Sequence, residues 1–162
     1  MFTPKSLTIL LGLLATLALP MQATAGDSVP LKGAESGTFQ LLGPCDTGGI
    51  ALEVNGTGHS SQLGAYTAHY RECFDPATGV VMGGSFTLTA ANGDTLYGVY
   101  GGQAVPMGDS GVLAYDDPGV ITGGTGRFAG AGGIANTSGS ANLATGEYSG
   151  TISGGVSKPA AS

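Results

Sequence analysis

Short runs of alternating apolar and polar residues, each ended by a turn signal, follow one another along most of this chain. In Ser85–Ala90, Phe86 and Leu88 alternate with small polar residues, as in a strand that buries one face. Asn92-Gly93 is a strong two-residue hairpin signal, and Thr95–Val105 is the returning strand. Beyond residue 25 no segment sustains a 3.6-residue period, so we expect an all-β protein without substantial helix.

The other strands are expected at Thr38–Leu42, Ile50–Asn55, Gly64–Cys73, Val112–Tyr115 and Val120–Thr122, with a last hairpin within Ala141–Gly155. Asp75–Gly79 and Leu143–Gly146 both end in Ala-Thr-Gly and are predicted turns. About eight strands in one small domain fit an antiparallel barrel or a sandwich. With 31 glycines and only 10% charged residues, open strand edges would favour aggregation. We therefore expect a single small antiparallel eight-stranded β-barrel, because closure removes those edges.

The first 25 residues have the three parts of a secretory signal peptide. Lys5 is basic, Leu7–Leu19 is apolar, and Ala23-Thr24-Ala25 supplies small residues for cleavage. The apolar run is shorter than the roughly 20 residues that a bilayer span needs, which argues against a membrane anchor. We predict a signal peptide (1–25), a polar lead-in (26–36), a barrel (37–155) and a disordered tail (156–162), in a secreted or periplasmic protein.

The two cysteines and the net charge limit the kinds of site. Cys45 and Cys73 would meet an oxidising compartment after export, so a disulfide is favoured over two free thiols. No metal site is expected, because neither cysteine belongs to a CxxC pair or has a histidine at ligand spacing. The net charge of −6, with five Lys and Arg, argues against a nucleic-acid partner.

The glycine-rich stretch Ile121–Gly133, which contains Gly-Gly-Thr-Gly-Arg-Phe, resembles the late motif of dirigent proteins and the matching segment of allene oxide cyclases. Two further features accompany it, a Gly-x-Gly-His segment at 56–59 before Leu63-Gly64 and the hairpin Ala91–Asp94. The resemblance spans about Thr38 to Ser153 and implies an eight-stranded antiparallel barrel. Exported bacterial relatives carry a similar pattern, so the resemblance implies an exported bacterial member of that superfamily.

The cyclase resemblance implies a catalytic pair on an early strand, for which Glu53 and Asn55 match in type and approximate position. Because side chains alternate along a strand, these two share one face, and Ile50, Leu52 and Val54 share the other. Either the aliphatic face fills the core and Glu53 lies in water, or the polar pair faces the barrel interior. The dirigent resemblance implies acidic residues and an arginine around an open barrel end, where Asp116, Asp117 and Arg127 are available.

Two functions follow, and the first is favoured because no catalytic motif is secure. One is an exported barrel that binds a small apolar ligand or a partner without catalysis; the other is a cofactor-free cyclase or isomerase that templates a reactive intermediate. A filled barrel without a cavity is a third alternative. The oligomeric state is not readable. The candidate ligand contacts are Tyr66, Tyr97, Tyr100, Arg127 and Phe128.

Overall fold

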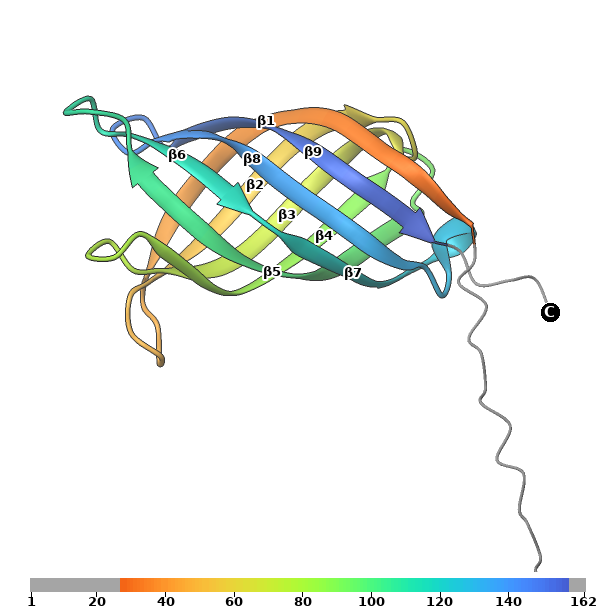
Figure 1. Ribbon diagram of the computed structural model, residues 1–162, viewed down its shortest axis with the longest axis horizontal. Coiled ribbons are helices and arrows are strands. Elements are labelled where there is room, and N and C mark those ends of the chain that lie inside the picture. Colours follow the sequence, from red (N-terminus) through yellow and green to blue (C-terminus); the bar gives the residue numbers. More distant parts are fainter. Residues whose placement is uncertain (1–26, 158–162) are drawn as a thin grey trace, which may run out of the picture.

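The computed structural model describes residues 27–157, whose strands wrap around a single axis (Figure 1). One short 3-10 helix, η1 (Gly126–Phe128), interrupts them. The strands are β1 (Ser28–Pro44), β2 (Ile50–Ser60), β3 (Gly64–Phe74), β4 (Val80–Ala90), β5 (Thr95–Pro106), β6 (Val112–Asp117), β7 (Gly119–Gly124), β8 (Gly132–Asn142) and β9 (Glu147–Ser157).

The sheet is a closed antiparallel barrel. Its order runs β4-β3-β2-β1-β9-β8-β6-β5, and the β4–β5 pairing closes the ring. Both β6 and β7 pair with β5 and β8, so together they occupy one strand position. They are separated at Pro118, which has no N–H to donate to the ladder. The nine segments thus form eight barrel strands, which confirms the predicted fold and excludes the sandwich.

The predicted turns are present, but the first strand begins earlier than expected. Gly93 has a φ of 88° and donates to the Ala90 carbonyl, which closes the Asn-Gly hairpin. Residues 28–36, expected as a polar lead-in, belong to β1 and pair with both β2 and β9. Val156 and Ser157, expected in the tail, belong to β9. The predicted signal peptide and residues 158–162 lie outside the described residues.

One end of the barrel is filled with apolar side chains. Phe128, carried inward by η1, is 1% exposed, and Leu88 and Leu96 are fully buried beside the β4–β5 hairpin. Leu31, Ile152 and Val156 complete the packing from β1 and β9. We call this the closed end; it is the right-hand end in Figure 1.

Inward-facing glycines make room for aromatic rings in the barrel interior. A methyl group on Gly84 would lie 2.7 Å from the Tyr100 ring, and one on Gly58 would lie 2.6 Å from the Tyr66 ring. Phe86 covers Gly98 in the same way. A small barrel accommodates large inward side chains by placing glycines opposite them. Packing inside the barrel therefore explains part of the high glycine content.

The predicted disulfide is present at the opposite end of the barrel. Cys45, in the β1–β2 connection, is bonded to Cys73 of β3, with a Cα–Cα distance of 6.1 Å. The bridge therefore ties a loop at that end to the barrel wall. None of the helices within residues 27–157 has the length and apolar character to cross a membrane.

Candidate functional site

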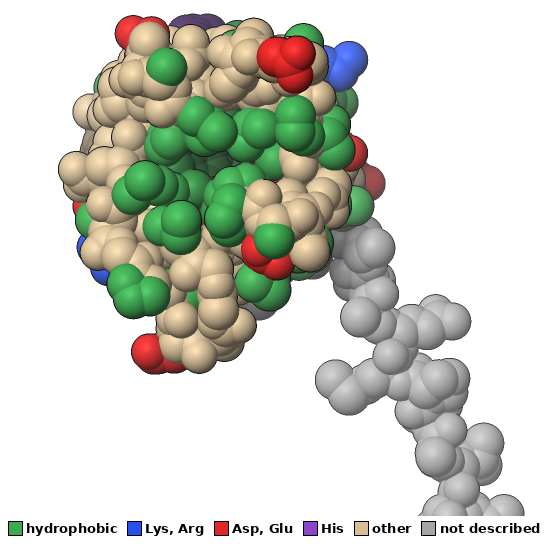
Figure 2. All heavy atoms as spheres, turned by 90° about the vertical axis from the view of Figure 1, so that its left-hand side faces the viewer, with side chains coloured by type: hydrophobic (Ala, Val, Ile, Leu, Met, Phe, Trp, Pro, Cys, Tyr) green, Lys and Arg blue, Asp and Glu red, His purple; other side chains and the backbone are tan. Residues whose placement is uncertain are grey.

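The end opposite Phe128 is open and leads into a cavity of about 380 Å³. We call it the open end; Figure 2 looks into it and shows hydrophobic side chains surrounding a central hollow. Four connections surround this mouth: β1–β2, β3–β4, β5–β6 and β8–β9. The cavity rules out the alternative of a fully filled barrel.

The wall of the cavity changes from apolar near the mouth to aromatic and acidic at greater depth. Apolar side chains come from inward positions of the strand ends and turns: Phe39, Leu41, Ile50, Leu52, Phe74, Pro76, Ala104, Leu113 and Leu143. The deeper set carries oxygen atoms: Glu35, Tyr70, Glu72, Tyr100, Tyr115, Asp117, Thr137 and Tyr148. A ligand in this space would meet mostly carbon, with polar groups concentrated at the floor.

Glu35 of β1 is held by two tyrosines of β3. The Tyr70 hydroxyl donates to Oε1 at 2.6 Å and the Tyr66 hydroxyl donates to Oε2 at 2.8 Å. Burial raises the pKa of the Glu35 carboxyl, and the two phenol hydrogen bonds offset only part of that effect. Both carboxyl oxygens of Glu35 are therefore already occupied by protein donors.

Glu72, further along β3, has a single phenol partner. The Tyr100 hydroxyl donates to its Oε2 atom, with the Tyr100 ring lying over Gly84 of the intervening strand β4. Burial raises the pKa of Glu72, opposed by that hydrogen bond. Burial, followed by the nearby Glu72 charge, raises the pKa of Tyr100, so this phenol remains the proton donor.

Asp117, the last residue of β6, is buried without such support. It is 7% exposed and packs against Gly102 of β5, where a Cβ atom would overlap it. Among the described residues, no hydrogen-bond partner is present for its buried Oδ1 atom or for the buried Tyr148 hydroxyl. Burial, then repulsion from Glu72 and Asp116, raises the pKa of Asp117 to about 7. Its carboxyl group can thus both release and accept a proton near neutral pH.

Three of the five predicted ligand contacts lie away from the cavity. Tyr100 lines it, and Tyr66 supports its floor through Glu35. Tyr97 points outward and is 41% exposed, whereas Phe128 belongs to the core of the closed end. Alternation along β5 explains the difference, because Tyr97 and Tyr100 are three positions apart and so lie on opposite sides of the sheet.

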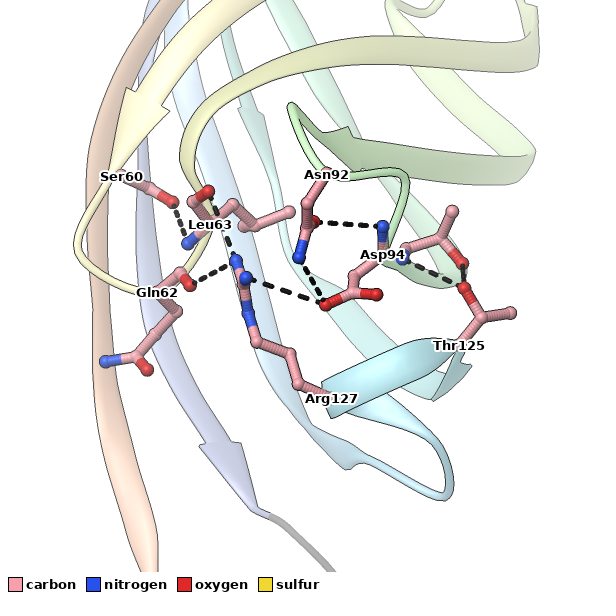
Figure 3. Close-up of polar contacts among 8 residues, drawn as sticks. Ser60, Gln62, Leu63, Asn92, Asp94, Thr125 and Arg127 are labelled. Carbon is pink, nitrogen blue, oxygen red and sulfur yellow. Dashed lines mark hydrogen bonds and ion pairs between the residues drawn. The ribbon is translucent and has the colours of Figure 1, made fainter.

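Arg127 joins three connections at the closed end (Figure 3). Its Nη2 atom donates to the carbonyls of Gln62 and Leu63 at 3.2 and 3.3 Å, and Nη1 lies 3.5 Å from Asp94 Oδ2. Its guanidinium carbon also lies 4.7 Å from the centre of the Phe128 ring. These contacts link the β2–β3 and β4–β5 connections to η1, which is a structural role. Of the acids named with Arg127, Asp117 faces the cavity and Asp116 is exposed.

Glu53 and Asn55 lie on the outer face of β2, so of the two alternatives for this strand the one with the aliphatic face inside is confirmed, and the one with the polar pair inside is wrong. Glu53 accepts hydrogen bonds from Gln40 and Arg71 and contacts His69 Nε2 at 2.9 Å. The hydrogen bonds with His69, Arg71 and Gln40, in that order, lower the Glu53 pKa to about 2. The aliphatic face of β2 has the interior position, with Leu52 buried and lining the cavity.

The carboxyl groups and tyrosines of the floor were not identified from the sequence, apart from Tyr66, Tyr100 and Asp117. Glu35 lay in the presumed lead-in, although Leu31, Glu35 and Phe39 share one strand face with Gly33 and Gly37. Tyr66, Tyr70 and Glu72 likewise share one face of β3. Extending the two-residue period would have placed these acids inside, through Gly33 and Gly37 for Glu35 and through Ala68 and Tyr70 for Glu72.

Comparison with known proteins supports the fold and no more. No family model matches the chain, and no curated protein matches it either. A solved structure of a pterocarpan synthase dirigent protein is similar in fold, with a TM-score of 0.55 over 88% of this chain and 94% of that chain. The two sequences are 14% identical over this match. The dirigent-like barrel expected from the glycine-rich motif is confirmed at the level of the fold.

Proposed function

We propose that this protein binds a small, mainly apolar ligand in the cavity at its open end. The observation that carries the proposal is the cavity itself, about 380 Å³ of space walled by apolar and aromatic side chains. Small-molecule sites typically measure about 300 to 1,000 Å³, with apolar walls and a few polar groups that orient the ligand. This cavity has a volume in that range, and it combines apolar walls with a few polar groups at the floor.

The rim of the mouth supports an apolar ligand. Leu41, Leu42 and Leu143 are each more than half exposed, as is Met107 in the β5–β6 connection. Exposed apolar residues of this size next to a cavity are typical of a binding entrance. Figure 2 shows hydrophobic side chains continuing from the rim into the hollow.

The test is the binding of N-phenyl-1-naphthylamine, a neutral apolar dye whose fluorescence rises when it leaves water. Ala141 faces the cavity from β8, so Ala141→Phe would fill it, whereas the neighbouring Ser140 faces outward. We expect dye binding to the unmodified protein and to Ser140→Phe, and a loss of at least about tenfold in affinity for Ala141→Phe. Equal binding by both variants would contradict the proposal.

A second candidate function is a cyclase or isomerase that templates a reactive intermediate in the same cavity. The observation that favours it is Asp117, whose pKa of about 7 suits proton transfer near neutral pH. A ligand extracted from the Asp117→Asn variant, which would bind it without converting it, should be converted on incubation with the unmodified protein. Recovery of the ligand unchanged would favour binding alone.

We also propose that the protein is exported. The support is the amino-terminal pattern of Lys5, Leu7–Leu19 and Ala23-Thr24-Ala25, together with the Cys45–Cys73 disulfide, which needs an oxidising compartment. Sequencing of the exported protein should begin at Gly26. A mature chain that retains Leu7–Leu19 would contradict the proposal.

A further inference from the structure

The charges around the cavity are all of one sign. Three carboxyl groups line it, those of Glu35, Glu72 and Asp117. Among the described residues that line the cavity, none is Lys, Arg or His. An anionic ligand would therefore be placed beside acids with no cation to balance it, which is strongly unfavourable in a desolvated site.

The acids are also surrounded by aromatic rings. Tyr70 and Tyr100 meet edge to face, with ring centres 5.8 Å apart, and both line the cavity. Tyr115 and Tyr148 add two more rings at the same depth. Aromatic faces next to a carboxylate attract organic cations, because the negative ring faces and the acid act in the same direction.

One carboxyl oxygen at the floor is buried without a hydrogen-bond donor among the described residues. Glu35 receives two phenol hydrogens and Glu72 receives one, but the buried Asp117 Oδ1 receives none from the described residues. A buried unsatisfied carboxyl oxygen costs free energy until a donor reaches it. The other unsatisfied group, the Tyr148 hydroxyl, is able to accept a hydrogen bond as well as donate one.

We propose that the ligand is an apolar amine, whose protonated nitrogen donates to Asp117 at the cavity floor while its apolar body lies against the upper wall. This inference rests on the ligand-binding function proposed above and names the class of ligand. An ammonium group supplies the missing donor and the missing positive charge at once, whereas an alcohol supplies only the donor. A carboxylate supplies neither.

The affinity for such an amine rises with pH across the titration of Asp117. The ionisable groups nearest to the Asp117 carboxyl are Glu72 of β3, Tyr100 of β5 and Asp116, which precedes Asp117 in the chain. Glu35, Tyr115 and Tyr148 line the same cavity. All of these groups are acidic, so none supplies a competing positive charge. Alkylamines stay protonated to about pH 10, whereas Asp117 becomes an anion above its pKa of about 7. Amine binding is therefore expected to be stronger at about pH 8 than at about pH 6.

The test is calorimetric titration of the disulfide-linked protein with three compounds that share one apolar body: 4-phenylbutylamine, 4-phenylbutan-1-ol and 4-phenylbutanoate. At about pH 8 we expect the amine to bind at least about tenfold more tightly than the alcohol, as a charge-assisted hydrogen bond provides. The carboxylate should bind most weakly. In Asp117→Asn the amine and alcohol affinities should come within about twofold of each other.

Asp116→Asn is the matched control, because it removes the same charge from the adjacent, exposed residue. It should keep the preference for the amine, and alcohol binding by Asp117→Asn shows that this variant is folded. If the alcohol binds as tightly as the amine, or if Asp117→Asn keeps the preference, the amine inference is overturned and the ligand-binding function stands. If none of the three compounds nor the naphthylamine dye binds, both fail.

Discussion

Phe128 and Asp117 are both almost fully buried, with exposures of 1% and 7%, but they lie at opposite ends of the barrel and have opposite energetic effects. Phe128 packs in an apolar core and contacts the Arg127 guanidinium group. Asp117 faces a cavity with an unsatisfied oxygen and a pKa raised to about 7. The closed end therefore stabilises the fold, while the open end maintains a site at a cost in stability.

The same sheet supports both ends because inward positions alternate between large side chains and glycine. At the closed end the rings and leucines fill the interior completely. Around the cavity the rings of Tyr100 and Tyr148 lie over glycines, against the wall of the barrel, and the centre is left open. The difference lies in the inward side chains, since the strand pairing is continuous around both ends.

The largest expected effect comes from making the same substitution at each end. Phe128→Ala should lower the free energy of unfolding by about 3 to 5 kcal/mol, because it leaves a cavity in a packed core. Phe39→Ala, at the half-buried rim of the open cavity, should cost about 1 kcal/mol but weaken dye binding. Urea unfolding measures the stability of each variant, and titration with the dye measures its affinity. Equal losses of stability would contradict the division between the two ends.

Removing the disulfide should loosen the open end. The two cysteines are 28 residues apart in sequence, and for a loop of that length chain entropy gives about 3.6 kcal/mol. The paired variant Cys45→Ser with Cys73→Ser should lose about that stability and bind the dye more weakly, since the bridge supports the wall around the mouth. Reduction of the unmodified protein should reproduce both effects; a melting temperature unaffected by reduction would refute this.

Asp117→Asn should stabilise the protein, and more so at higher pH. The carboxyl has a pKa of 3.8 in the unfolded chain and about 7 in the barrel, so the folded state holds the extra proton between these values. Stability therefore falls as pH rises from about 4 to 7, and an amide avoids this loss. We expect Asp117→Asn to raise the free energy of unfolding by about 2 kcal/mol or more at pH 8, and to change it very little at pH 4.

Melting curves at the two pH values check this prediction, with Asp116→Asn as the control for lost surface charge. Glu35 and Glu72 also have raised pKa values, so some decrease in stability with pH should persist in Asp117→Asn. An Asp117→Asn variant that is less stable than the unmodified protein at pH 8 would show that the native carboxylate has a stabilising partner.

The barrel could be predicted because its signals are local. The hairpin at Asn92-Gly93 and the turn at Asp75–Gly79 each lie within a few residues, and the structure confirms both. The floor of the cavity could not be predicted in the same way, because its contacts are distant in sequence. Glu35 meets Tyr66 and Tyr70 across separations of 31 and 35 residues.

Asp117 shows a second limit. The run Asp116-Asp117-Pro118 has the composition of a solvated turn, and only strand register decides which acid faces inward. Asp116 is exposed and Asp117 is buried, although they are adjacent and identical in type. The alternation on β2 was readable, since Leu52 and Val54 favoured the interior on hydrophobicity alone, and the cyclase resemblance pointed the other way.

The smallest effect is expected for Glu53→Gln, on the outer face of β2. The carboxylate is 19% exposed and lies between His69 and Arg71, which are 45% and 62% exposed. Because exposed ion pairs contribute little, we expect no clear change in melting temperature at neutral pH. The affinity for the naphthylamine dye should not change, because Glu53 is separated from the cavity by the sheet.

The pH dependence follows from the pKa of Glu53, which is about 2 against a reference of 4.5. Any stabilisation by this carboxylate is therefore complete above pH 4.5 and is lost only as pH falls toward 2. Titration of the dye at pH 7 and melting at pH 3 and 7 measure both effects. A large loss of dye binding in Glu53→Gln, with the fold intact, would restore the outer polar pair as a site and weaken the contrast between the two ends.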